Sequence, residues 1–263
     1  MSTNAMHVAK TGLNAQQTRL QVISNNLANV NTTGFKRDRA NFESLLYQVS
    51  RPGGDQTSEN TNLTSALAIG TGVRVVSTDK LHTQGALSDT GNALDVAING
   101  QGFFQVLLPD GRIGYTRDGT FSMNQEGTLT TASGYVIQPE IQIPQGANQI
   151  NISADGIVSV VMPGDTQNQE IGQITLGNFP NPRGLEPIGE NFFVETLASG
   201  APIVATPQAE GLGQLTQGML ETSNVNVVQE LVDMIETQRA YEINSKSISA
   251  ADEMLRFMSN KMG

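Results

Sequence analysis

The hydrophobic pattern of the chain changes twice along its length, and its first part predicts a helix. Apolar side chains recur there in two interleaved series spaced seven residues apart, as in an amphipathic helix with a coiled-coil contact line. The stretch Asn31–Gly34 ends the series, and Gly34 suits the left-handed conformation that commonly follows a helix. The two series are Met6, Leu13, Leu20 and Leu27, and Ala9, Gln16, Ile23 and Val30.

A second helix is predicted at the other end of the chain. Asn226 is a favourable N-cap residue, with Gln229 and Glu230 in the first turn. Residues 227–262 would form a helix of roughly 54 Å, which is longer than a compact domain of this size comfortably covers. Met234, Tyr241, Ile248 and Leu255 stand seven residues apart, and Leu231, Ile235, Ala251 and Met258 flank them.

The region between the helices has a different composition. Almost all of the 27 glycines and all ten prolines lie in it. From Val73 onward, Asp110–Gly111, Asp118–Gly119 and similar pairs are hairpin-turn signals between short apolar stretches, and they predict one antiparallel β domain. Residues 35–72 are expected to be extended. By composition alone, the polar stretch Gln56–Ser65 is typical of a flexible surface loop.

Together these elements predict an α+β protein. The terminal helices form an antiparallel coiled-coil hairpin, which an extended linker joins to an antiparallel all-β domain. The predicted segments are residues 1–34 for the N-terminal helix, 35–72 for the linker, 73–220 for the β domain and 221–263 for the C-terminal helix.

Neither helical stripe can remain in water, so each needs a partner surface. The stripes could pack on the β domain, or they could pair with each other in a helical hairpin. A hairpin still leaves outer faces exposed, which many copies side by side would bury, and such a contact repeats without closing and builds a helical filament. We therefore expect a self-assembly interface at Leu13, Leu20, Ile23, Leu27, Val30, Leu231, Met234, Ile235, Tyr241, Ile248 and Leu255.

Composition excludes several functional classes. The 263 residues include 15 basic and 25 acidic residues, a net charge of −10, and binding to a nucleic-acid backbone needs clustered Lys and Arg instead. The absence of cysteine excludes disulfides and Cys-ligated zinc. No apolar run approaches the roughly 18 residues that span a bilayer, and the first residues do not have the pattern of an ordinary cleaved signal peptide.

No catalytic, cofactor-binding or metal site is predicted. The chain has no nucleophile elbow, zinc-protease motif, P-loop or complete dinucleotide fingerprint. Gly100–Gly102 begins like such a fingerprint but lacks its third glycine, and residues 118–124 resemble a calcium loop without the closing glutamate, so tight turns are expected at both. The histidines are His7 and His82, and we expect a structural role for His82.

Longer stretches at both ends resemble the signature motifs of a known family. Residues 24–36, SNNLANVNTTGFK, are similar to the N-terminal motif of bacterial flagellar rod and hook proteins, and Ala15–Gln17 precede them. Residues 221–227, ETSNVNV, and 238–246, QRAYEINSK, resemble the matching C-terminal motif. The stretches that are most similar to distal-rod members of this family are residues 42–47, 95–106, 115–119 and 188–191, so the resemblance covers essentially the whole chain.

The resemblance implies a non-enzymatic structural subunit of the flagellar basal body, without a cofactor. Such subunits form a helical homopolymer whose terminal helices make an inner tube around the export channel, with the β domain outside. The resemblance further implies export through the flagellar type III apparatus and a place in the rod that crosses the periplasm and transmits torque. The implied partners are proximal rod and hook proteins and the P-ring and L-ring proteins.

In distal-rod members, the resemblance also implies a rigidity insertion after the first helix. The matching positions are residues 47–64, represented by Tyr47, Arg51, Pro52, Asn60 and Thr64. We expect neighbouring copies to order this stretch in the polymer, and we expect it to be disordered in a free monomer. Three alternatives stay open: a hook or proximal rod subunit of the same family, a peptidoglycan hydrolase, and a peptide- or glycan-binding adhesin built on the β domain.

Overall fold

A computed structural model of the chain describes residues 2–51, 56–58, 61–62, 65–147, 149–163 and 168–262. The chain divides into two compact units, each built from segments that are distant in the sequence. The helix–ribbon unit comprises Met1–Leu27, Asp38–Asp79 and Asn226–Gly263, and the β unit comprises Ala28–Arg37 and Lys80–Val225. The division into four consecutive segments remains a prediction.

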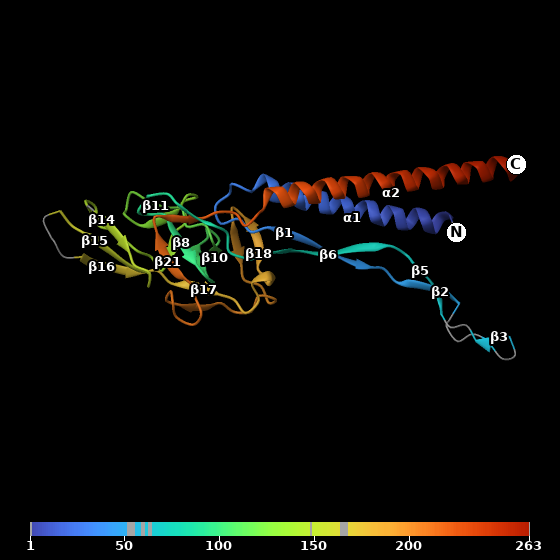
Figure 1. Cartoon of the computed structure of the whole chain (residues 1–263). Coiled ribbons are helices and arrows are strands. Elements are labelled where there is room, and N and C mark those ends of the chain that lie inside the picture. The colour runs from blue at the N-terminus through green and yellow to red at the C-terminus, as the bar shows by residue number, and fades with distance from the viewer. Residues whose placement is uncertain are drawn as a thin grey trace. The chain divides into compact units, whose positions relative to one another are not determined.

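Two long helices lie side by side in the helix–ribbon unit and run in opposite directions (Figure 1). They are α1, Ser2–Ala28, and α2, Val227–Met262. The predicted N-cap of α2 is confirmed, because Oδ1 of Asn226 accepts hydrogen bonds from the backbone N–H groups of Val228 and Gln229 at 3.1 and 3.2 Å. Helix α1 ends before the predicted stop at Asn31–Gly34, and turns occupy those residues.

A two-stranded ribbon completes the helix–ribbon unit (Figure 1). The outgoing strands β1, Asp38–Ser44, β2, Tyr47–Arg51, and β3, Gln56–Ser58, pair with the returning strands β6, Val73–Lys80, β5, Leu67–Gly70, and β4, Thr61–Asn62. Between the first two pairs, the N–H of Leu45 donates to the carbonyl of Gly72 at 2.8 Å. Composition alone predicts a flexible loop for residues 56–65, but backbone pairing makes strands of residues 56–58 and 61–62.

The β unit contains one large sheet with the strand order β18–β19–β10–β9–β17–β20, in which β13 also pairs with β9. Its strands are β9, Phe103–Leu107, β10, Ile113–Thr116, β13, Ile137–Gln138, β17, Leu176–Asn178, β18, Glu186–Gly189, β19, Phe192–Val194, and β20, Ile203–Ala205. A 3-10 turn, η1, spans Pro182–Gly184.

The β unit also contains smaller sheets. They pair β7, Leu87–Asp89, with β22, Met219–Glu221; β8, Val96–Asn99, with β21, Gln214–Gln217; β11, Phe121–Met123, with β12, Leu129–Thr131; and β15, Ile157–Val161, with β14, Gln149–Ile152, and β16, Asn168–Gln173. All pairings whose register is described in this unit are antiparallel, as predicted.

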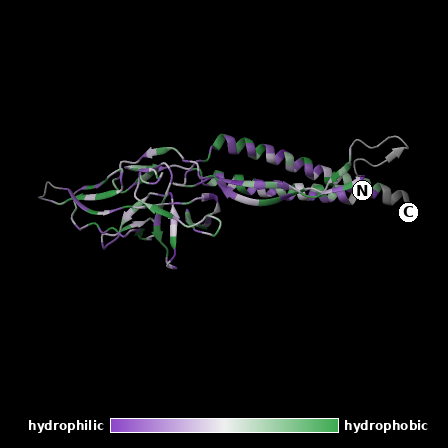
Figure 2. Cartoon of the chain, turned by 90° about the horizontal axis from the view of Figure 1, so that it is seen from below, coloured by the Kyte–Doolittle hydropathy of each residue, from purple (hydrophilic) through white to green (hydrophobic). Residues whose placement is uncertain are grey.

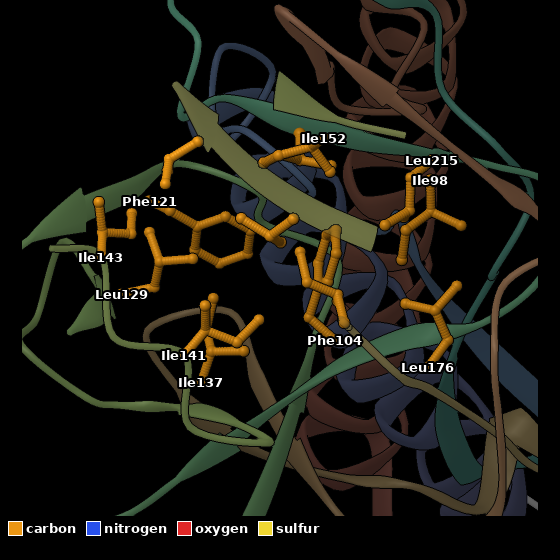
Figure 3. Close-up of a cluster of buried hydrophobic side chains, with 14 of the residues drawn as sticks. Ile98, Phe104, Phe121, Leu129, Ile137, Ile141, Ile143, Ile152, Leu176 and Leu215 are labelled. Carbon is orange, nitrogen blue, oxygen red and sulfur yellow. The ribbon is translucent and has the colours of Figure 1, made fainter. Parts of the chain in front are cut away.

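Side chains from several of these sheets meet in one apolar core (Figure 3). Phe104 lies at its centre without exposure and contacts Phe121 edge to face, with ring centroids 5.0 Å apart. The core holds together strands that have no hydrogen bonds to one another, because burying each large apolar side chain contributes about 1.5–3 kcal/mol. The α+β class, with two terminal helices and an antiparallel β region between them, is therefore confirmed.

Candidate assembly surfaces

Small and polar residues lie along the contact line between α1 and α2, on the face of α1 that also carries the buried Ile23. A Cβ atom at Gly12 would lie 3.2 Å from Nδ2 of Asn244, so the helices approach closely at this point. Farther along, Arg19 and Asp233 form an ion pair at 3.6 Å. Near the end of α1, buried Asn26 donates to Glu230 at 3.2 Å and to the carbonyl of Asp38 at 2.9 Å. These contacts set the register of the antiparallel pair.

The predicted interface residues separate by exposure rather than meeting in one line. Ile23 is buried; Leu13, Leu20, Leu27, Val30, Met234, Ile248 and Leu255 are half-buried; and Leu231, Ile235 and Tyr241 are exposed. Leu13, Leu20 and Leu27 each follow, by one position, a residue that contacts α2. The heptad spacing identified the helices, but it could not show which of two adjacent faces lies against the partner helix.

A second apolar row runs along the exposed side of α2. At 100° per residue, it lies opposite Met234, Ile248 and Leu255. We call this row the outer stripe; it consists of Val228, Val232, Ile235, Ile243, Met254 and Phe257, all exposed. The hydropathy colouring shows apolar residues interspersed with polar ones along both helices (Figure 2). Of this row, only Ile235 was predicted to be an interface residue, although Val228, Val232 and Ile235 are spaced by four, three and seven residues, which is a helical signal in the sequence.

The ribbon also exposes large apolar side chains. Leu46 is 88% exposed, and Tyr47, Val49, Leu67 and Ile69 are each at least half exposed. Of the predicted insertion residues, Tyr47 and Arg51 lie exposed on β2, whereas Pro52, Asn60 and Thr64 lie outside the described residues. In the structure, residues 47–51 pair with β5. Their disorder in a free monomer stays a prediction.

A buried ionic cluster in the β unit joins three distant parts of the chain. It consists of Lys36, Arg117 and Glu221, each at most 4% exposed. Nζ of Lys36 donates to Oε1 of Glu221 at 2.5 Å and to the carbonyl of Thr83 at 2.9 Å. Arg117 donates to Oε2 of Glu221 at 3.4 Å, and the N–H of Gly85 donates to Oε1 at 2.7 Å. Burial lowers the pKa of Lys36, while the carboxylate of Glu221 opposes that shift.

Backbone contacts around this cluster fix the segments by which the chain passes between the two units. The N–H of Gly34 donates to the carbonyl of Glu221 at 2.8 Å. The side chain of Asn224 accepts from the N–H of Arg37 and donates to the carbonyl of Leu81, both at 2.7 Å. In the sequence, Lys36 and Glu221 are the last residue of the N-terminal motif and the first residue of the C-terminal motif, and neither was predicted to form a site. The one signal in the sequence was that both residues lie where a terminal motif adjoins the central region of the chain.

His82 packs between two phenylalanine rings beside the ionic cluster. Its ring centroid lies 5.5 Å from those of Phe103 and Phe193, both edge to face. Burial lowers the pKa of His82 from 6.5 to about 4, and the charges of Lys36, Arg117 and Lys80 add to that shift. The ring is therefore neutral at pH 7, in keeping with the structural role expected for it.

Lowering the pH should destabilise the protein through this ring. In the unfolded chain this histidine becomes protonated below about pH 6.5, whereas in the folded protein it stays neutral down to about pH 4. The free energy of unfolding therefore falls as the pH drops between these values. The loss should reach about 3 kcal/mol at pH 4. Urea unfolding at several pH values would measure it. The variant His82→Gln should show a shallower decline than the wild type, and identical slopes would contradict this assignment.

The described residues offer neither a metal-binding cluster nor a membrane-spanning helix. They contain no group of three or more His, Asp or Glu side chains arranged to hold a metal ion. Among the described residues, neither helix is long and apolar enough to cross a membrane. The features described above are exposed apolar surfaces on the helix–ribbon unit and a hydrogen-bonded ionic cluster in the β unit.

Three known families match separate parts of the chain. Residues 6–36 match the family described as flagella basal body rod protein. Residues 97–160 match the flagellar hook protein FlgE/F/G D1 domain, and residues 216–261 match the flagellar basal body rod FlgEFG protein C-terminal region. The three matches follow the order of the terminal helices and the β region between them.

Similar proteins extend this correspondence over nearly the whole length. Flagellar basal-body rod protein FlgG of Buchnera aphidicola (subsp. Acyrthosiphon pisum) is 58% identical over 255 residues, which are 97% of this chain and 98% of its own. The FlgG of Caulobacter vibrioides is 48% identical over 253 residues, with 96% and 97% covered. Flagellar basal-body rod protein FlgF of the same bacterium is 33% identical over 267 residues, with 99% and 98% covered. The chain belongs to the flagellar basal-body rod protein family.

Proposed function

We propose that this protein is a structural, non-enzymatic subunit of the distal rod of the bacterial flagellar basal body. Copies assemble into a rigid helical tube that encloses the export channel and transmits torque from the motor to the hook, and so supports motility. Relatives named FlgG at 46–59% identity support this place over the hook and proximal-rod alternatives, since the similar FlgF is 33% identical.

The observation that carries the proposal is the apolar surface that a single chain leaves uncovered. The outer stripe follows α2 through several turns, from Val228 to Phe257. Each square ångström of apolar surface removed from water contributes about 25 cal/mol, so covering the stripe is a substantial driving force for association. Contacts between non-identical faces of identical subunits repeat without closing, and they produce a tube or filament.

We place the contacts between copies on the outer stripe and on the predicted residues that flank the helix pair. The exposure of Leu231, Ile235 and Tyr241 supports their availability to a neighbouring subunit. Leu13 and Leu20 are half-buried on α1 and would complete the contact with a second copy. The remaining predicted interface residues would stabilise the same assembly, either at the edge of a contact between copies or by packing within each subunit.

We assign the stiffening role to the ribbon around residues 47–64. A hydrogen-bonded pair of strands resists bending more than a single extended strand does, and β2 with β5 forms such a pair. An isolated two-stranded ribbon is at best marginally stable in water. The exposed Leu46, Tyr47 and Val49 would therefore gain most from lying along adjacent subunits.

The proposed partners and location follow from this role. At its two ends the polymer meets proximal rod and hook proteins, and around its circumference it meets the P-ring and L-ring proteins. The subunit reaches the growing rod through the flagellar type III export apparatus, and the finished rod spans the periplasm.

Placing a charge on the outer stripe should abolish polymerisation while leaving the chain folded. Ile235 is 51% exposed, so Ile235→Asp should not disturb the single subunit, but every contact in the polymer would then bury an unpaired carboxylate. Sedimentation of concentrated protein, with negative-stain microscopy of the pellet, measures the outcome. We expect polymers from the wild type and none from Ile235→Asp.

An exposed residue of the β unit provides a matched control. Gln125→Glu adds the same single negative charge at an exposed turn residue that lies outside the outer stripe, and this variant should still polymerise. Normal polymers from Ile235→Asp would exclude this stripe as a subunit contact.

A further inference from the structure

A cavity of about 510 Å³ opens in the β unit next to the ionic cluster. Its wall is formed by Leu81–Gln84, Gly100–Phe103, Arg117, Asn178 and Pro182–Arg183. It therefore combines an apolar lining with amides and two guanidinium groups. Nothing in the assembly role assigns an occupant to it.

Basic residues gather at this cavity in a unit that is otherwise acidic. The β unit has fourteen acidic and only six basic residues. Two of the six, Arg117 and Arg183, lie in the wall. Two more, Lys36 and Lys80, are close enough to the wall residue His82 to lower its pKa. An anionic group would meet favourable charge here and repulsion over most of the remaining surface.

Arg117 has hydrogen-bonding capacity that its own unit does not use. Its side chain is 4% exposed, and its contact with Glu221 is long, at 3.4 Å. Its Nε atom has no hydrogen-bond partner among the described residues. A guanidinium presents a planar set of donors that matches a carboxylate, and a buried, partly satisfied one gains from a second acceptor.

The rest of the wall suits a peptide rather than a free inorganic anion. Leu81 and Pro182 are half-buried and offer apolar surface for the body of a ligand. The side-chain amides of Gln101 and Asn178 can donate to and accept from peptide groups. A volume of about 510 Å³ is also several times larger than a single small ion needs.

We propose that this cavity binds an acidic segment of another protein, with a carboxylate of that segment meeting the guanidinium groups of Arg117 and Arg183. The peptide groups of the segment lie against Gln101 and Asn178. This binding site is separate from the outer stripe, so it adds a protein contact that polymerisation through α2 does not require.

Binding of a labelled Glu–Gly hexapeptide to the full-length protein tests the site by fluorescence anisotropy. We expect saturable binding that weakens with added salt, and no binding of a Lys–Gly hexapeptide. Arg183→Gln should weaken binding about fivefold or more, because it removes one charge from the wall. Gln101→Ala should weaken it too without changing the charge, which separates peptide recognition from attraction to any anion.

Arg112→Gln is the matched control, since Arg112 is exposed, outside the cavity wall and paired with Asp110 at 2.6 Å. Its affinity for the hexapeptide should equal that of the wild type. Equal weakening by Arg112→Gln and Arg183→Gln, an absence of saturation below 1 mM peptide, or displacement of the peptide by equimolar inorganic phosphate would each overturn the proposal. The sedimentation assay of Ile235→Asp is unaffected by these results and tests polymerisation separately.

Discussion

Replacing Glu221 with leucine is expected to destabilise the β unit by about 3–5 kcal/mol. The substitution leaves the charges of Lys36 and Arg117 buried without the carboxylate that receives hydrogen bonds from both. It also removes the acceptor for the N–H of Gly85. Urea unfolding followed by circular dichroism measures the loss as a shift of the midpoint.

Two further variants serve as comparisons. One removes all three charges of the cluster, and the other breaks an exposed ion pair. Replacing Lys36, Arg117 and Glu221 together with Met, Leu and Leu removes all three charges, and should restore most of the stability, because a packed apolar cluster often substitutes for a buried ionic one. Asp110→Asn breaks the exposed pair with Arg112 and should leave the midpoint unchanged. If Glu221→Leu behaved like Asp110→Asn, the cluster would have no stabilising role.

The second large effect is expected for Gly34→Ala, which should lower the free energy of unfolding by about 3 kcal/mol or more. Gly34 has a φ of +67°, which an alanine adopts only at a cost of about 1–2 kcal/mol. In addition, a Cβ there would lie 2.7 Å from the backbone carbon of Arg117 and from the backbone nitrogen of Asp118. Backbone atoms of a packed strand end cannot give way as a flexible side chain can. Thermal unfolding measures the effect.

A second glycine isolates the steric part of this cost. Gly134 has a φ of +85°, but a Cβ there would meet nothing within 4 Å. Gly134→Ala should therefore lose only the conformational contribution, about 1–2 kcal/mol. Equal losses in the two variants would mean that the close approach of Gly34 to Arg117 is unimportant.

The helices were the most predictable part of the fold. Their heptad spacing and the N-cap at Asn226 are local properties, and both are present in the structure. The strands of the β unit followed in the same way from turn signals and alternation. In contrast, Gly34 was predicted to have a left-handed conformation as the end of a helix. It has that conformation, but α1 has already ended at Ala28, and the backbone of Arg117 leaves no room for a Cβ at this position.

The candidate assembly surfaces were predictable only in part. Heptad spacing identified apolar residues on both helices, and one of them, Ile23, is buried on the contact face. That face also uses Gly12, Arg19 and Asn26, which carry no hydrophobic signal. The small size of Gly12 and the polar partners of Arg19 and Asn26 on α2 select that face. The outer stripe then remains exposed, and this outcome depends on which side of α2 is already occupied.

By itself, the amino-acid sequence determined the terminal helices, the antiparallel β region between them and the membership of a rod family, because periodicity, turn chemistry and motifs are properties of neighbouring residues. Only the tertiary structure decided that Lys36, Arg117 and Glu221 form one buried cluster, since Arg117 and Glu221 are 104 positions apart in the chain. It alone decided which apolar side chains stay in water. Burial depends on where distant segments are placed, and no local pattern contains that information.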